Sequence, residues 1–134
     1  MALPICLLDV LIQTFPDKPD FWLLQAHTYL GMKQPQKAAV DLEALDAIGK
    51  ASVDSLYTLG DIYLSESLPD LALQAYARAM VKDPKQSPVR AIRSAEGLAG
   101  RGGHDQAMAL VSRVRSTAGD ALGDSDKQIG RAHV

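Results

Sequence analysis

The sequence predicts an all-α fold in which helices pack as antiparallel pairs along a solenoid. The first reason is a repeat, because the pattern of residues 53–86 recurs 34 positions earlier, in residues 19–52. The second is spacing, since small and bulky apolar residues recur every three or four positions, as they do on one face of a helix. The third is punctuation, because prolines and glycines stand where helices would begin and end. We therefore expect about seven helices and no strand.

The better-preserved unit lies in residues 53–86. A small residue, Gly60, stands three positions before Tyr63, and Pro84 closes the unit. The positions that carry the pattern are Leu56, Leu59, Gly60, Tyr63, Ala72, Tyr76, Ala79 and Pro84. This stretch resembles the tetratricopeptide repeat, a helix–turn–helix unit of 34 residues. Leu56 departs from the tryptophan that the family prefers, but it is also large and apolar.

The preceding unit, residues 19–52, follows the same pattern. Trp22 takes the place of Leu56, and Gly49 supplies a stop signal one residue before the position equivalent to Pro84. The other matching positions are Ala26, Tyr29, Ala38, Leu42 and Leu45. Another step of 34 residues takes Pro84 to Pro16, so residues 1–18 are expected to hold only the second helix of a truncated repeat.

That half repeat is expected to form a helix from Pro4 to about Thr14. Its buried stripe would consist of Leu7, Leu8, Leu11 and Ile12. Cys6 lies among these apolar residues, so we expect a buried thiol and not a nucleophile. Natural solenoids close their ends with polar caps, and none is visible here. Exposed repeat ends are therefore expected to promote self-association.

Helix signals agree with the repeat boundaries. Ser52 is expected to cap a helix with Asp54 in its first turn. The run Ser67-Leu68-Pro69-Asp70 supplies a cap, a proline at the first helical position and an acid for the next helix, which would end near Lys82. The aromatic residues at pattern positions are expected to be core residues: Trp22, Tyr29, Tyr63 and Tyr76.

Residues 87–119 are expected to form a third, degenerate repeat that lacks the aromatic residues of the pattern. Ser87 and Pro88 would start its first helix, and a group of glycines at 100–103 would end it. Residues 120–128 are polar and are interpreted as a linker or the start of further sequence. Residues 129–134 match a translated sequencing adaptor, an artefact that we exclude from fold reasoning.

Composition narrows the classes of function. The net charge of −2 gives no argument for binding nucleic acid. Residues 1–67 carry 4 Lys/Arg against 9 Asp/Glu, whereas residues 68–134 carry 10 against 7. No run of 18 apolar residues could cross a membrane. The single cysteine fits a reducing compartment, which slightly favours a soluble cytoplasmic protein and leaves export open.

Catalytic and ligand-binding motifs were sought and not found. The three histidines, His27, His104 and His133, have no partners at metal-ligand spacing. The glycines at 100–103 do not follow a strand, so they are interpreted as a turn and not as a phosphate loop. We predict no enzyme activity, no catalytic residue, no metal and no cofactor.

The resemblance implies a right-handed superhelix whose concave face, built from first helices, binds a peptide or helix of another protein. The chain would then be a non-catalytic interaction scaffold. An alternative is a substrate-positioning or regulatory module of a larger enzyme or of a secretion or assembly protein. An RNA-binding role is disfavoured because the groove candidates are acidic.

The groove positions implied by the family are Asp20, Leu23, His27, Leu30, Asp54, Tyr57, Asp61 and Leu64. They include no Lys or Arg, so the basic clamp with which tetratricopeptide co-chaperones bind an acidic chain end has no counterpart here. A partner segment with apolar anchors and a few basic residues would suit the strip. Packing of Leu30 and Leu64 against a neighbouring helix is the alternative reading of those two positions.

Overall fold

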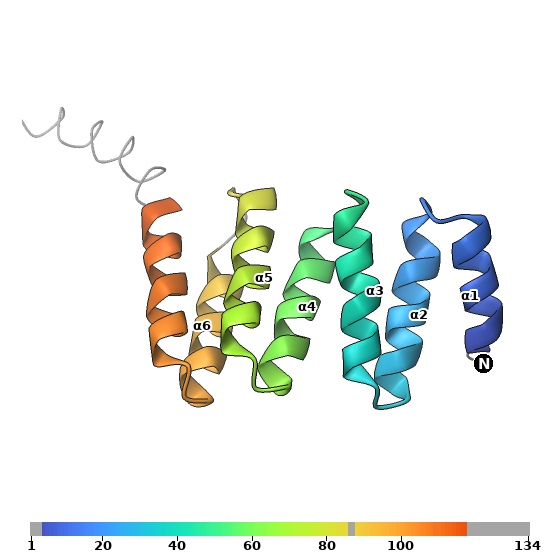
Figure 1. Ribbon diagram of the computed structural model, residues 1–134. Coiled ribbons are helices and arrows are strands. Elements are labelled where there is room, and N and C mark those ends of the chain that lie inside the picture. Colours follow the sequence, from blue (N-terminus) through green and yellow to red (C-terminus); the bar gives the residue numbers. More distant parts are fainter. Residues whose placement is uncertain (1–3, 86–87, 118–134) are drawn as a thin grey trace, which may run out of the picture.

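The computed structural model describes residues 4–85 and 88–117, and every regular element in these ranges is a helix (Figure 1). The predicted all-α class and the expectation of about seven helices are confirmed. The predictions for residues 120–128 and 129–134, and the cap at Ser87, lie outside the described residues. The helices are α1 (Ile5–Thr14), α2 (Pro19–Gly31), α3 (Pro35–Ala47), α4 (Val53–Ser65), α5 (Pro69–Lys82), α6 (Val89–Gly100) and a last helix described over 104–117.

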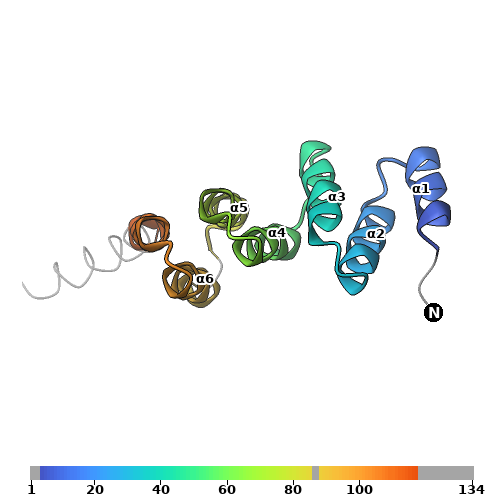
Figure 2. The same cartoon turned by 60° about the horizontal axis from the view of Figure 1, so that its bottom comes forward.

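The helices lie in two rows along the length of the molecule. Figure 2 shows α2, α4 and α6 in one row and α1, α3, α5 and the last helix in the other. Each helix of the first row packs antiparallel to the following helix of the second row, as the repeat pattern predicts. The molecule therefore has two long faces, one made by first helices and one made by second helices.

The turn inside each helix pair has the same backbone geometry. Lys33 and Ser67 adopt positive φ angles of 59° and 62°, and Gly102 follows with 87°. The next amide closes each helix end, as Leu68 N donates to Tyr63 O (2.9 Å) and Gly103 N donates to Leu98 O (2.8 Å). The interval lengthens from 34 to 35 residues at Gly102, which accounts for the one-residue shift in the last pair.

Helix starts agree with the sequence signals at one position and differ at two. Ser52 caps α4, where its hydroxyl accepts from the Ser55 amide (3.0 Å). Ser67 does not cap α5, because it is occupied in the left-handed turn described above, and Leu68 holds the cap position without a side-chain bond. Pro88 precedes α6 as its cap residue, so the helix begins one residue later than expected.

The core lies where α4 and α5 meet. Tyr76 is fully buried there, and its hydroxyl donates to Asp61 Oδ1 (2.6 Å). Gly60 allows the ring to approach the α4 backbone, because a methyl group at that position would lie 2.9 Å from Tyr76 Cζ and closer still to two other ring carbons. Small residues on α5, including Ala72 and Ala79, bring the helices together on either side of the ring.

Three expectations about buried side chains are corrected. Trp22 is half-buried and not a core residue, and its indole Nε1 donates to Pro16 O (2.7 Å) at the turn before α2. Cys6 is exposed. In the stripe of α1, Leu8 and Ile12 are buried against α2, whereas Leu7 is exposed and Leu11 is half-buried. The stripe is narrower than expected because α1 packs on one neighbouring helix in the described structure.

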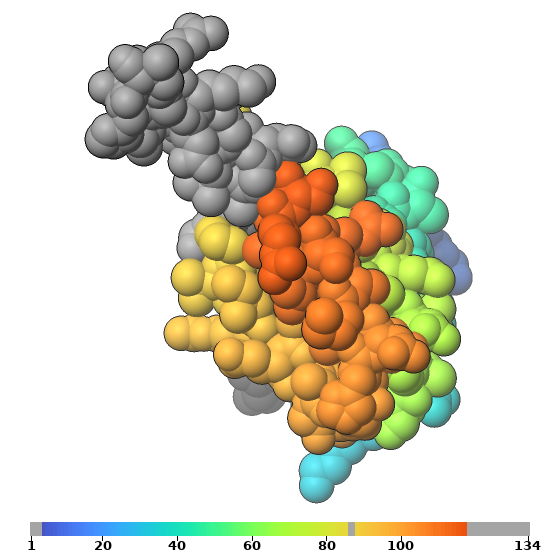
Figure 3. All heavy atoms as spheres, turned by 90° about the vertical axis from the view of Figure 1, so that its left-hand side faces the viewer, coloured from blue at the N-terminus to red at the C-terminus, as the bar shows by residue number. Residues whose placement is uncertain are grey.

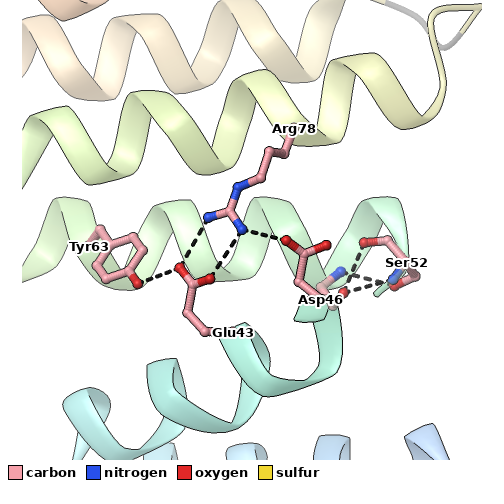
Figure 4. Close-up of polar contacts among 6 residues, drawn as sticks. Glu43, Asp46, Ser52, Tyr63 and Arg78 are labelled. Carbon is pink, nitrogen blue, oxygen red and sulfur yellow. Dashed lines mark hydrogen bonds and ion pairs between the residues drawn. The ribbon is translucent and has the colours of Figure 1, made fainter. Parts of the chain in front are cut away.

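A polar network connects three helices of adjacent repeats (Figure 4). Arg78 on α5 donates to Glu43 (3.0 and 3.1 Å) and Asp46 (2.5 Å) on α3. The Tyr63 hydroxyl on α4 donates to Glu43 Oε1 (2.6 Å), and this bond together with burial raises the Tyr63 pKa to about 12. Bonds to Arg78 and Tyr63 lower the pKa of Glu43 in spite of its partial burial. The network fixes the register between α3 and α5.

Within residues 4–85 and 88–117, no helix has the length and apolar content needed to cross a membrane.

The contact between Gly60 and Tyr76 gives a stability prediction. Gly60→Ala should destabilise the fold by about 1–3 kcal/mol, because the added methyl overlaps a buried ring that cannot move freely. The matched control is Gly31→Ala at the end of α2, where a methyl meets no atom within 4 Å. That variant should be neutral or more stable by up to about 1 kcal/mol. Urea unfolding of both variants decides the matter, and equal effects would refute the close-approach interpretation.

A buried carboxylate on α3 gives a prediction about pH. Asp41 is 5 % exposed, its Oδ2 has no hydrogen-bond partner among the described residues, and burial together with the charge of Asp9 raises its pKa to about 7. Asp9 on α1 and Tyr29 on α2 are the titratable groups that interact with it. The folded state therefore holds this proton more tightly than the unfolded chain, whose Asp pKa is near 3.8.

Stability should accordingly fall as pH rises from about 4 to about 7, by at most about 4 kcal/mol, because each pKa unit is worth about 1.4 kcal/mol. Asp41→Asn should remove most of this slope and raise stability at pH 8. The control is Asp17→Asn, since Asp17 is an exposed residue of the turn before α2. Urea unfolding between pH 4 and pH 8 is the measurement, and a slope that persists in Asp41→Asn would contradict the assignment.

Candidate functional site

A hollow of about 280 Å³ opens between α2 and α4, on the face made by first helices. The α2 wall is formed by Leu23, Ala26, His27 and Leu30. Leu42 of α3 lies at the base, and Asp54 and Thr58 are on the α4 side together with the serines of the cap. The hollow thus combines an apolar wall with a polar opposite side. We call it the α2–α4 groove.

The polar groups of the α2–α4 groove differ in how far they are free to bind a partner. Ser52 and Ser55 bond to one another in the cap of α4, so their hydrogen-bonding capacity is largely used. Asp54 pairs with Arg90 of α6. His27 is exposed at the rim with no printed bond in the described part of the chain. The side chains open to a ligand are therefore mainly apolar ones together with His27.

The structure brings together four of the eight predicted groove residues, namely Leu23, His27, Leu30 and Asp54. Asp20 is exposed in the first turn of α2, outside the lining of the hollow. Leu64 points at α6, where its Cδ2 lies 3.0 Å from the position that a side chain on Gly97 would take. For Leu64, packing against the neighbouring helix is therefore the correct alternative.

Tyr57 and Asp61 are engaged within the fold. Tyr57 is only 3 % exposed, which corrects the expectation that its ring lines an open groove. The Arg90 guanidinium lies over this ring at 4.4 Å from the centroid, and the Tyr76 ring lies 5.9 Å away on α5. Burial raises the pKa of Tyr57 although the Arg90 charge lowers it. The Asp61 carboxylate accepts the Tyr76 hydroxyl, as described for the core.

Arg90 is a residue of this face that the sequence analysis missed. It stands at the start of α6, in the repeat that lacks the family's aromatic positions, so the pattern gave no reason to select it. Its contacts with Asp54 and Tyr57 join residues that are more than 30 positions apart. A basic residue one repeat after an acid–tyrosine pair is the only sequence signal that could have indicated them.

In the part of the chain that the structure describes, no three His, Cys, Asp or Glu side chains gather as a metal site. The α2–α4 groove also places no base beside a nucleophile: His27 lies in it with Ser and Thr hydroxyls, of which the serines are used in the cap. The arrangement is suited to binding an apolar or basic group, not to activating one.

Comparisons with known proteins relate this chain to others through its fold. No family model matches the sequence. No curated protein matches it either. Among solved structures, the crystal structure of MamA aligns with a TM-score of 0.64 and 18 % sequence identity. The alignment covers 84 % of this chain and 66 % of that one, so this chain spans less than two thirds of the solved chain.

At that level of identity the likeness shows the fold alone. The chain has a tetratricopeptide-like fold, a right-handed α-solenoid of antiparallel helix pairs, as the sequence predicts. Proteins of this architecture act as interaction scaffolds, so the site must be argued from its own side chains.

The contact between Arg90 and Tyr57 gives a prediction. Arg90→Met keeps a long apolar stem over the ring but removes the charge, so stability should fall by about 1 kcal/mol through loss of the cation–π contact and the Asp54 pair. Arg93→Met, at an exposed position of the same helix, is the control and should change stability by less than about 0.5 kcal/mol. Urea unfolding at low and high salt measures both, and a larger loss in the control would contradict the contact.

Proposed function

We propose that the chain is a non-catalytic protein-interaction scaffold that binds an extended or helical segment of a partner protein in the α2–α4 groove. The observation that supports this proposal is the groove itself, an apolar hollow on the first-helix face with polar groups on one side. Helical solenoids use such hollows to take the anchor residues of a partner, while the surrounding backbone stays rigid.

The lining indicates the chemistry of the partner. Leu23 and Leu30 offer apolar area for one or two aliphatic or aromatic anchors. Asp20 at the start of α2 has no ion pair among the described residues, and Asp54 shares its charge with Arg90. A segment with apolar anchors and a basic residue directed toward α2 is therefore favoured, and an acidic one meets like charge.

Self-association through the repeat ends stays a prediction alongside this proposal. Leu7 and Val10 are exposed on α1, and they would form the contact surface.

The experiment is a pair of titrations with labelled peptides, one basic and amphipathic, the other acidic. The basic peptide should bind more tightly. His27→Lys should weaken its binding by about fivefold, which corresponds to about 1 kcal/mol for an added like charge at an exposed site. The matched control is Gln13→Lys on α1, an exposed position outside the groove, which should leave the affinity within about twofold.

Two outcomes would contradict the proposal. In the first, the acidic peptide binds more tightly than the basic one. In the second, Gln13→Lys weakens binding as much as His27→Lys does, which would mean that only overall charge matters. Helical content and unfolding midpoints of each variant separate loss of the site from loss of the fold.

A further inference from the structure

A second, larger hollow lies on the opposite face, made by second helices. It has a volume of about 620 Å³ and adjoins another of about 360 Å³, and the two share Ala77, Val81 and Arg113 in their linings. Figure 3 looks at this end of the molecule, with the last helix in orange beside α5. We call the two adjoining hollows the α5 groove. Nothing in the α2–α4 groove takes part in it.

The α5 groove has an apolar floor and a basic rim. Leu56 and Ala77 are buried at its floor, and Val81 stands in it with 74 % of its area exposed. That is the highest exposed fraction among the exposed large apolar side chains of the described residues. A valine in this position leaves apolar area in water at the boundary of two hollows, which a bound apolar side chain would cover.

Three cations line the same surface. Arg78 is held by Glu43 and Asp46, so it forms a fixed wall. Lys82, at the end of α5, and Arg113, on the last helix, are exposed and make no ion pair with any described residue. The nearest acid in the chain, Asp83, accepts from the Lys85 amide in its own turn. The surface therefore presents two uncompensated positive charges beside an apolar floor.

We propose that the α5 groove is a second docking surface, which binds an acidic amphipathic helical segment of another protein. The partner's carboxylates would pair with Lys82 and Arg113, and its apolar side chains would cover Val81 and the floor beside it. Charge complementarity selects an acidic partner, and the apolar floor selects a protein segment over a nucleic acid, which would need a longer row of phosphate contacts.

Opposite chemistries on the two faces make the two sites separable. The α2–α4 groove favours a basic segment, whereas the α5 groove favours an acidic one. The chain could thus hold two different segments at once, one on each face, and neither site depends on the other being correct.

The probe is a labelled helical peptide with Leu at i and i+4 and Glu on both flanks, titrated against the full chain by fluorescence anisotropy. Arg113→Glu should weaken binding at least tenfold, and Arg113→Gln about threefold. Val81→Ser should weaken it about fivefold. Raising the salt concentration from 50 to 200 mM should weaken binding to the unmodified chain more than to Arg113→Glu.

Each variant has a matched control. Arg101→Glu makes the same charge reversal at an exposed turn residue after α6, and Val40→Ser makes the same apolar-to-polar change on α3, where Val40 is 68 % exposed. Both controls should bind the peptide within twofold of the unmodified chain. Circular dichroism melting curves check that Arg113→Glu and Val81→Ser fold as the unmodified chain does.

Four results would overturn the proposal. One is a control variant that loses as much affinity as its counterpart. Another is a scrambled peptide of the same composition that binds equally well, which would indicate general charge attraction. A third is an RNA oligonucleotide that binds more tightly and is insensitive to Val81→Ser. The last is sedimentation showing that Arg113→Glu abolishes self-association while no acidic peptide binds, which would assign the surface to a second copy of the chain.

Discussion

The close approach of α4 and α5 at Gly60 is the constraint on which the rest of the solenoid depends. Tyr76 fills the space that a side chain at position 60 would occupy, so the spacing of the two helices is set by a buried ring. Its hydroxyl also bonds to Asp61, which fixes the ring along the helix axis. A pair held at one spacing and one register presents its flanks at fixed positions, and neighbouring pairs can then stack on it.

Polar contacts at similar sequence separations join one repeat to the next. Arg78 reaches back 35 residues to Glu43, Arg90 reaches 36 residues to Asp54, and Gln106 reaches 36 residues to Asp70. Exposed or half-buried pairs of this kind contribute little stability each, typically less than about 1 kcal/mol. Apolar packing therefore holds the stack together, while the polar pairs select the register in which neighbouring repeats meet.

The fold could be predicted from sequence because the repeat states the same packing twice, with Gly60 and Tyr76 at family positions. The site could be predicted only in part. Leu23, His27 and Leu30 depend on the face of one helix, which periodicity gives, whereas the burial of Tyr57 depends on Arg90 from the following repeat. Trp22 shows the same limit, since its position in the pattern indicated a core residue but its depth is set by how far α1 covers α2.

The degenerate repeat is what makes the two faces differ. By losing the aromatic positions of the pattern, it has gained basic residues on both rows of helices: Arg90 at the start of α6 and Arg113 on the last helix. On the first-helix face, Arg90 covers Tyr57 and shares the charge of Asp54, so the acidic character there is concentrated toward α2. On the other face, Arg113 stands beside exposed Val81 with no acid to compensate it. A departure from the family pattern therefore supplies the charge asymmetry that a uniform stack of identical repeats would lack.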